Sequence, residues 1–317
     1  MDISIVIPVY NEDESLPELC SWIERVVHAN GYSYEVILVD DGSTDCSWEV
    51  VQKLRTSNPH IKGIKFQRNY GKSAALNEGF KAARGEVVIT MDADMQDSPD
   101  EIPELRRMIL EDKYDMVSGW KKVRHDPISK TLPSKFFNWT TAKVSKIKLH
   151  DFNCGLKAYR NKVVKGIEVY GEMHRYIPVI AKWSGFRKIG EKVVEHRARK
   201  YGYTKFGGLG RGLKGLLDLA SITFVGKYGK RPMHFFGPLG VICGLVGFLE
   251  VISLVIQKFE NMQSFTLTNK PSFYIALTCM VLGTQLFLTG FIAELISRNS
   301  SGRNHYLIEQ KLGLELS

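Results

Sequence analysis

The sequence predicts an α/β protein with a mostly parallel, doubly wound sheet, helices on both faces of that sheet, and two transmembrane helices. Three observations carry this prediction. Short apolar runs of strand length alternate with helix-length segments through residues 1–91, which is the pattern of a parallel sheet. Polar residues follow each apolar run at the point where the strand would end. Two later segments are almost entirely apolar over more than 20 residues each, which is long enough for a membrane span.

The N-terminal elements follow one another in a regular order. Strands are expected at Ile3–Val9, Glu35–Val39, Ile61–Gln67 and Val87–Met91, and helices at Glu14–His28, Ser47–Thr56 and Ser73–Ala83. Sheets of this type bind ligands beyond the carboxyl ends of their strands. We therefore expect the polar groups that follow the strands to lie together: Tyr10-Asn11-Glu12, Asp40-Asp41, Arg68-Asn69 and Asp92-Ala93-Asp94.

The two apolar segments, Phe235–Ile256 and Phe273–Ile296, are expected to be transmembrane helices. Each lacks the polar face that a helix packed on a soluble core would show, although a pair of buried core helices is the alternative. Lysine and arginine residues precede the first segment and follow the second, whereas the connecting loop has only Lys258 and Lys270. This distribution predicts that both flanks, and the N-terminal part of the chain, are cytoplasmic.

Two apolar stripes recur at helical spacing between the predicted sheet and the predicted spans. One lies within residues 136–147 and the other within residues 209–224, each beside lysines or arginines. Interfacial helices lying on the membrane, with Trp139 at the level of the headgroups, would account for this pattern. Helices packed on the globular core are the alternative.

The charges are divided unevenly along the chain. Residues 1–119 contain 12 Lys/Arg and 22 Asp/Glu, a net charge of −10, whereas residues 120–214 contain 23 and 6, a net charge of +17. A carboxylate-rich part suits metal and sugar chemistry, and a basic part suits phosphate or an anionic membrane. The five cysteines form no Cys-x-x-Cys pair, which disfavours a zinc site or a disulfide framework.

The run Asp92-Ala93-Asp94 is the strongest chemical signal in the chain. Two carboxylates one residue apart can converge on one divalent cation when the backbone turns after a strand, and Gln96 follows two residues later. Oxygen ligands favour Mg²⁺ or Mn²⁺, which would neutralise a diphosphate. An acidic surface turn is the alternative for an isolated Asp-x-Asp, but this one follows a predicted strand.

Several motifs occur along the chain in one order: Pro8-Val9-Tyr10-Asn11-Glu12, Asp40-Asp41-Gly42-Ser43, Arg68-Asn69-Tyr70-Gly71-Lys72, Met91-Asp92-Ala93-Asp94-Met95-Gln96, Gly171-Glu172-Met173-His174-Arg175 and Glu195-His196-Arg197. Together they resemble the family-2 glycosyltransferases of GT-A fold, and more narrowly the polyprenyl-phosphate glycosyltransferases related to dolichyl-phosphate-mannose synthase. The resemblance covers nearly the whole chain and includes the two-span tail of the bacterial members. It departs mildly at Lys121 and Lys130, where relatives often carry arginine, and at Thr204, where many have serine.

The resemblance implies a GT-A, Rossmann-like sheet and an enzyme that uses a UDP- or GDP-linked sugar donor together with Mg²⁺ or Mn²⁺. Asp94 would be the catalytic carboxylate. The metal ligands would be Asp92, Asp94 and Gln96. The donor-binding residues would be Pro8, Tyr10, Glu12, Asp40, Lys72, Asp92, Ala93, Arg199 and Lys205.

The acceptor is expected to be a polyprenyl phosphate, either undecaprenyl or dolichyl phosphate, from its chemistry as well as from the resemblance. A phosphate monoester is largely dianionic near neutral pH and is already nucleophilic, whereas a sugar hydroxyl needs a general base. Direct displacement by the phosphate would invert the anomeric carbon. Asp151 acting as a base is the alternative. The acceptor phosphate would be bound by Lys121, Arg124, Lys130 and Ser134.

Other functions fit the sequence less well. A processive polysaccharide synthase of the same superfamily carries a Gln-x-x-Arg-Trp motif, and no Arg-Trp pair occurs in this sequence. A membrane glycosyltransferase that acts on a glycan hydroxyl, in single additions or processively, is the remaining enzymatic alternative. A protein that binds nucleic acid through its basic part would gain nothing from acidic strand ends, which repel phosphate.

The expected organisation has four parts. They are a cytoplasmic catalytic domain at 1–205, amphipathic juxtamembrane helices at 206–232, two transmembrane helices at 233–297 with an extracytoplasmic loop at 257–272, and a cytoplasmic tail at 298–317. Gly240 and Gly244 form a Gly-x-x-x-Gly motif, which lets helix backbones approach closely, so we expect a homo-oligomer. The protein would be an integral protein of a bacterial inner membrane.

Overall fold

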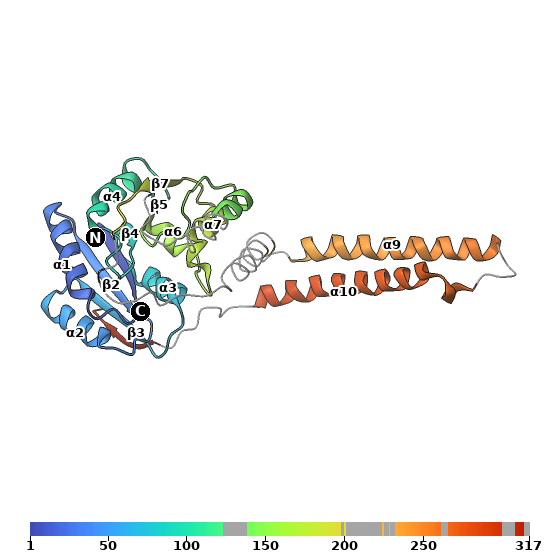
Figure 1. Cartoon of the computed structure of the whole chain (residues 1–317), viewed down its shortest axis with the longest axis horizontal. Coiled ribbons are helices and arrows are strands. Elements are labelled where there is room, and N and C mark those ends of the chain that lie inside the picture. Colours follow the sequence, from blue (N-terminus) through green and yellow to red (C-terminus); the bar gives the residue numbers. More distant parts are fainter. Residues whose placement is uncertain are drawn as a thin grey trace. The chain divides into compact units, whose positions relative to one another are not determined.

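The computed structural model describes residues 1–122, 138–197, 200, 224, 228, 232–260, 266–299 and 308–313 (Figure 1). The chain divides into two compact units. One consists of Met1–Ile222 together with Asn304–Ser317, and the other of Thr223–Arg303.

A single sheet forms the centre of the first unit. Among the described residues it has eight strands, in the order β7-β5-β6-β4-β1-β2-β3-β8. The central strands β3, β2, β1 and β4 are parallel to one another, whereas β6 is antiparallel to both β4 and β5. The mostly parallel α/β sheet is therefore confirmed. The strands are β1 (Ile3–Val9), β2 (Tyr34–Asp40), β3 (Ile61–Phe66), β4 (Val87–Thr90), β5 (Met116–Trp120), β6 (Lys157–Arg160), β7 (Ile189–Val193) and β8 (Ile308–Leu312).

Helices cover both faces of this sheet. On one face α1 (Leu16–Ala29), α2 (Ser47–Ser57) and α4 (Ile102–Leu110) contribute to one apolar cluster, and on the other α3 (Lys72–Ala82), α6 (Asn161–Lys165) and α7 (Ile177–Trp183) contribute to a second. The central strands are apolar at nearly every position because both of their faces are buried. Short 3₁₀ turns lie at η1 (Pro99–Glu101) and η2 (Met173–Arg175).

The strand β8 was not expected, since the residues that form it belong to the predicted tail. It pairs antiparallel with β3, and the indole nitrogen of Trp48 on α2 donates a hydrogen bond of 2.9 Å to the Gln310 side-chain oxygen. Leu312 packs against the core cluster of α1 and α2. A five-residue edge strand with polar residues between two apolar ones has little signal of its own, because its partner strand lies about 240 residues earlier in the chain.

The second unit is a hairpin of two long helices, α9 (Met233–Glu260) and α10 (Pro271–Asn299), with the short turn η3 (Leu267–Asn269) before α10. Both helices are long and apolar enough to cross a membrane, and only 17% of the most apolar stretch of each is buried. Such low burial contradicts the alternative of two core helices.

The glycines of α9 are used within the hairpin. A Cβ atom at Gly240 would lie 2.7 Å from the carbonyl oxygen of Gly283, and one at Gly247 would lie 2.7 Å from that of Ala276. A Cβ atom at Gly244 would meet nothing within 4 Å. The close backbone approach that the Gly-x-x-x-Gly motif predicts thus occurs between α9 and α10 of one chain, and self-association stays a prediction.

Part of the first predicted interfacial stripe is helical, at residues 138–145. Trp139 on this helix is 60% exposed, and the Lys143 ammonium lies 5.1 Å from the centre of its ring, whereas Thr141 and Ser145 are buried. This helix therefore packs on the core with one face and presents an exposed Trp–Lys pair on another. Its contact with a membrane stays a prediction. All of the second stripe except Phe224, and nearly all of segment 206–232, lie outside the described residues.

Candidate active site

The carboxyl ends of three neighbouring strands bring the predicted site residues to one edge of the sheet. β1 lies between β2 and β4, with Val9 opposite Asp40 and Val6 opposite Thr90. The segments that follow these strands therefore leave the sheet side by side. Pro8, Tyr10 and Glu12 are half-buried there. The expected convergence of strand ends is observed.

Hydrogen bonds join the loops that follow β1 and β2. Asn11 has a positive φ of 53°, its side-chain oxygen accepts a hydrogen bond of 2.8 Å from the Thr44 amide, and its own amide donates one of 3.0 Å to the Ser43 hydroxyl. The Glu12 amide donates a bond of 2.8 Å to the Ser47 hydroxyl. These bonds hold the polar groups after β1 against those after β2.

Asp40, the last residue of β2, is fully buried. One carboxylate oxygen accepts a hydrogen bond of 2.9 Å from the Ser43 amide, but Oδ2 finds no hydrogen-bond donor among the described residues. Burial raises the pKa of this carboxyl above its usual value. A buried acceptor without a donor is costly, so Asp40 is suited to receive a hydroxyl or N–H group from a ligand.

The neighbouring Asp41 organises the loop that leads to α3. Its carboxylate accepts hydrogen bonds from the Tyr70 amide at 2.7 Å and from the Gly71 amide at 2.9 Å. Burial raises the pKa of Asp41 to about 6, against the opposing effect of these two bonds. Gly71 has a φ of +94°, a backbone conformation that glycine adopts without strain. The loop is thereby fixed immediately before Lys72, the first residue of α3.

Asp92, just beyond β4, forms an ion pair with Lys72. Burial raises the pKa of Asp92, but the charges of Lys72 and Lys121 outweigh burial and lower it to about 2. A Cβ atom at Gly155 would lie 2.5 Å from the carboxyl carbon of Asp92, so only glycine leaves room for this carboxylate. The Thr90 hydroxyl holds Gly155 in place by donating a 2.8 Å hydrogen bond to its carbonyl oxygen.

The turn after Asp92 presents a second carboxylate. Asp94 accepts a hydrogen bond of 3.2 Å from the Gln96 amide, and Met95 between them has a positive φ of 62°. The Gln96 side chain donates a bond of 3.4 Å to the Arg197 carbonyl oxygen. The Gln96 amide group is therefore turned toward residue 197 in this structure.

These residues fit a divalent cation. In the part of the chain that the structure describes, no group of three or more His, Cys, Asp or Glu side chains could form a complete cage for a metal ion. Mg²⁺, however, is commonly held by one or two carboxylates together with substrate phosphates, and Mn²⁺ prefers the same oxygen ligands. Asp92 and Asp94 supply two such carboxylates, and the pKa of Asp92 keeps that carboxylate ionised at neutral pH.

The part of the chain that contains these carboxylates matches a known protein family. The sequence model of glycosyl transferase family 2 matches residues 4–167, which is more than half of the chain. The matched part runs from β1 past β6 and contains Asp40, Asp92 and Asp94. The chain belongs to glycosyl transferase family 2.

Two relatives match this glycosyltransferase along nearly its whole length. The dodecaprenyl-phosphate galacturonate synthase of Rhizobium johnstonii is 33% identical over 316 residues, covering 98% of this chain and 93% of that protein. The undecaprenyl-phosphate 4-deoxy-4-formamido-L-arabinose transferase of Pseudomonas paraeruginosa is 32% identical over 313 residues, covering 97% and 89%. Both names specify a sugar and a polyprenyl phosphate, and both matches are long enough to include most of α9 and α10.

Solved structures share the fold at lower identity. The glucosyl-3-phosphoglycerate synthase of Mycobacterium tuberculosis, in complex with Mn²⁺, UDP-glucose and phosphoglyceric acid, has a TM-score of 0.53 and 17% identity, covering 69% of this chain and 80% of that one. The mannosyl-3-phosphoglycerate synthase of Rubrobacter xylanophilus has a TM-score of 0.54 and 14% identity, covering 71% and 74%. These likenesses confirm the GT-A fold of this glycosyltransferase.

The predicted acceptor residues are only partly described. Lys121 is 13% exposed and its ammonium lies 2.8 Å from the buried carboxylate of Asp97. Burial lowers the pKa of Lys121, but the charges of Asp97 and Asp92 raise it above the usual lysine value. This lysine thus faces the acidic turn of the glycosyltransferase, and its contact with a lipid phosphate stays a prediction. The predicted site residues outside the described residues are Arg124, Lys130, Ser134, Arg199 and Lys205.

Two residues of the site were not expected from the sequence. Lys157 on β6 is only 4% exposed, its ammonium donates to the Cys154 carbonyl oxygen, and burial lowers its pKa. Burial also lowers the pKa of His174 well below the usual value, and its Nδ1 lies 3.1 Å from the Ser73 hydroxyl. A lysine inside a buried strand is itself a signal, because a charge is rarely buried without a purpose. Both residues line a narrow pocket together with Pro8, Lys72, Asp92 and Asn153.

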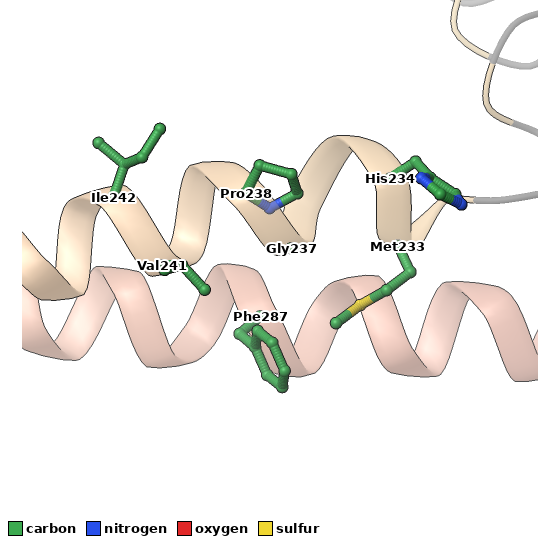
Figure 2. A pocket seen from close by; sticks show the side chains of 7 residues that line it. All are labelled: Met233, His234, Gly237, Pro238, Val241, Ile242 and Phe287. Atoms are coloured by element: carbon green, nitrogen blue, oxygen red, sulfur yellow. The ribbon is translucent and has the colours of Figure 1, made fainter.

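A wider pocket lies on the helical hairpin of the second unit (Figure 2). Apart from His234, its lining is apolar, and it comes from α9 and one residue of α10. It offers no carboxylate and no lysine or arginine for group transfer. The lining residues are Met233, His234, Gly237, Pro238, Val241, Ile242 and Phe287.

Proposed function

We propose that this glycosyltransferase transfers a sugar from a UDP- or GDP-linked donor to a polyprenyl phosphate, such as undecaprenyl or dolichyl phosphate, with inversion at the anomeric carbon. The observation that carries the proposal is the extent of the match to relatives named for polyprenyl phosphates, at 98% and 97% of this chain. Such a match is long enough to include both the carboxylates of the proposed donor site and the apolar hairpin of the proposed membrane anchor.

The donor would lie along the strand ends. Asp40 offers an unpaired buried oxygen to the ribose or base, beside Pro8, Tyr10 and Glu12, while Lys72 and Ala93 would lie nearer the diphosphate. Asp92, Asp94 and Gln96 would hold Mg²⁺ or Mn²⁺, with Asp94 as the catalytic carboxylate. The bound metal would neutralise charge on the leaving diphosphate. Arg199 and Lys205 would complete the diphosphate site.

The acceptor phosphate would attack directly. As a dianion it needs no base, so the protein's task is to hold two anions close together and in line. The cations proposed for this task are Lys121, Arg124 and Lys130, with Ser134. Asp151 is 1% exposed and its carboxylate accepts a hydrogen bond of 2.9 Å from the Asn153 amide, which suits a residue that shapes the loop better than one that collects a proton.

The hairpin of α9 and α10 would anchor the enzyme in a membrane, with the catalytic unit on the cytoplasmic face. Two features support this placement: the length and apolarity of both helices, and the lysines and arginines that flank them. A bacterial inner membrane fits the bacterial relatives. A homo-oligomer remains part of the proposal, without nucleic acid as a partner.

A donor and acceptor panel tests the proposal. The purified full chain in nanodiscs is supplied with UDP- or GDP-sugars, Mn²⁺ or Mg²⁺, and undecaprenyl or dolichyl phosphate, and mass spectrometry detects a lipid-phosphate sugar. Transfer to a glycan hydroxyl, with none to either lipid phosphate, would contradict the proposal and favour the alternative.

Within the same assay, Lys130→Ala and Ser134→Ala should raise KM for the lipid phosphate much more than KM for the donor. Equal effects on both substrates would assign these residues to the donor site.

A further inference from the structure

Lysines surround the carboxylates to which the proposed function assigns a metal. Lys72 forms its ion pair directly with Asp92. Lys121 pairs with Asp97, and the charges of both Lys121 and Lys157 act on Asp92. The ammonium that touches Asp92 thus occupies one oxygen of the carboxylate that would bind the cation.

The balance of charge at this turn is close to neutral. The acidic turn carries three carboxylates, at Asp92, Asp94 and Asp97, and three ammonium groups face it, at Lys72, Lys121 and Lys157. A free divalent cation would gain little attraction from such a site, and it would be repelled by the ammonium of Lys72, because charges a few ångströms apart interact strongly where water is partly excluded. A nucleoside diphosphate reverses this balance, since its negative charges attract the cation and the lysine together.

The geometry lets Lys72 change partners while its backbone stays fixed. Asp41 holds the amide of Gly71 immediately before it, and α3 begins at Lys72. The Lys72 side chain is 32% exposed and lines the same pocket as Pro8 and Asp92. A long, flexible side chain on a fixed backbone can move from a carboxylate to a phosphate without a change in the fold.

From these observations, and resting on the proposed function, we propose that Lys72 disfavours metal binding until a nucleotide arrives. The cation and the diphosphate then bind together, and Lys72 passes from Asp92 to the diphosphate. Because coupling between two ligands is reciprocal, the metal should tighten nucleotide binding by the same factor by which the nucleotide tightens metal binding.

Mn²⁺ binding, followed by electron paramagnetic resonance, tests this role without relying on activity. The full chain in nanodiscs is titrated with Mn²⁺ alone, with UDP and with GDP, and the signal of each nucleotide–Mn²⁺ mixture without protein is subtracted. For the wild type we expect weak binding of Mn²⁺ alone, and affinity at least about tenfold higher with the nucleotide of the natural donor. Lys72→Met should tighten the binding of Mn²⁺ alone by about tenfold and reduce the gain from nucleotide.

Two further variants separate the role of Lys72 from general effects of charge. Lys81→Met removes the same charge from the same helix, where the exposed Lys81 pairs with Glu78, and should leave Mn²⁺ binding within about twofold of the wild type. Lys72→Arg keeps the charge and should keep the binding of Mn²⁺ alone weak. Circular dichroism checks that each variant is folded.

Two results would overturn the proposal: equal Mn²⁺ affinity of the wild type with and without nucleotide, or unchanged binding of Mn²⁺ alone in Lys72→Met. Asp92→Asn distinguishes such a failure from a failure of the metal site. If either result is found and Asp92→Asn abolishes Mn²⁺ binding, the metal site is kept and only the role of Lys72 is rejected. The lipid-phosphate assay tests the proposed function separately, since it detects product whichever way the metal binds.

Discussion

The two ends of β2 carry buried carboxylates in opposite situations. Glu35, near the start of the strand, and Asp40, at its end, are both fully buried. Glu35 accepts hydrogen bonds from the Ser4 hydroxyl and from the Arg84 amide, and it forms an ion pair of 2.6 Å with Lys62. One carboxylate oxygen of Asp40 is bonded, and the other has no donor within the described part of the chain. The carboxylate at the start of the strand is therefore fully bonded within the fold, whereas the one at its end keeps an acceptor oxygen for the donor that we propose.

The pKa values follow the same division. Burial raises the pKa of Glu35, but the bonds from Lys62 and Ser4 outweigh burial and lower it overall. Burial dominates at Asp40, and the pKa is raised. A buried carboxylate whose pKa is lowered by protein partners contributes to stability, whereas one that burial alone governs costs stability and points to binding. Along β2 the comparison therefore separates Glu35, which maintains the fold, from Asp40, for which we propose a role in binding the donor.

The largest expected effect is on catalysis, and it comes from a substitution at the carboxyl ends of the strands. Asp94→Asn should lower kcat for sugar transfer by about 10³-fold, because it removes a charged metal ligand. The melting temperature of the catalytic unit should change little, because the side-chain oxygen of asparagine can still accept the hydrogen bond that the Gln96 amide donates to this carboxylate. Steady-state kinetics and thermal unfolding in detergent check both halves. An active Asp94→Asn enzyme, or full wild-type activity in excess EDTA, would contradict the metal site.

At the other end of the sheet the expected effect is on stability. Glu35→Gln should lower the free energy of unfolding by about 3 kcal/mol, because Lys62 is left partly buried without its counter-charge. The value of kcat per folded molecule should not change. Glu104→Gln is the matched control, since Glu104 pairs with Arg107 on the surface, and it should cost less than about 1 kcal/mol. A large loss of kcat in folded Glu35→Gln would remove the distinction between the two ends.

A smaller effect is expected at Asp40, where nucleotide binding and fold stability can both be measured for one side chain. Asp40→Asn should weaken nucleotide binding by about tenfold, because a carboxylate accepts a ligand hydrogen bond more strongly than an amide does. It should leave the free energy of unfolding unchanged or slightly higher, because the buried charge is removed. Calorimetry with UDP and GDP, alongside denaturant unfolding, measures both quantities. A strongly destabilised Asp40→Asn variant would show that the Asp40 carboxylate, like that of Glu35, mainly stabilises the fold.

The smallest expected effect is the pH dependence of stability. The folded pKa of Asp41 is about 6, above the ordinary aspartate value of 3.8, so between these two values the folded state holds a proton that the unfolded state has lost. The stability that Asp41 contributes to the folded state is thus present at low pH and is lost as pH rises through 6. The pKa of Glu35 is lowered in the folded state. The stability that Glu35 contributes is therefore present when the pH is above the ordinary glutamate pKa, and it is lost as the pH falls through the folded pKa.

Asp41→Asn and Glu35→Gln should therefore change the pH profile of unfolding in opposite directions. Between pH 4 and pH 8 the wild type should lose stability relative to Asp41→Asn by the order of 1 kcal/mol, since one pKa unit corresponds to about 1.4 kcal/mol. On acidification below pH 4 the wild type should instead lose its advantage over Glu35→Gln. Parallel profiles for the two variants would show that their carboxylates are in similar environments.

The sequence predicted the carboxyl ends of the parallel strands, where the proposed site lies, better than the opposite end of the sheet, where Glu35 lies. Asp92, Asp94 and Asp40 could be identified because each follows an apolar run, and a strand end is a local signal. Glu35 gave no such signal, since its partners Ser4, Lys62 and Arg84 come from three separate segments. Lys157 and His174 were missed for the same reason, because burial and cross-strand neighbours are decided by tertiary packing. The antiparallel insertion of β6 between β4 and β5 is also non-local, and no periodicity in the chain reports it.

The late position of β8 has a consequence for how the protein is made. As the chain leaves the ribosome, β1 to β7 emerge before the apolar hairpin, and β8 emerges after it. The edge of β3 therefore stays open until α9 and α10 have been synthesised, and an open edge can pair with other chains. Removal of residues 304–317 would prolong that exposure indefinitely, and a bulky fusion placed directly after Leu312 would crowd the same edge. Expression strategies that preserve a free segment after α10 should accordingly give less aggregated protein than those that shorten it.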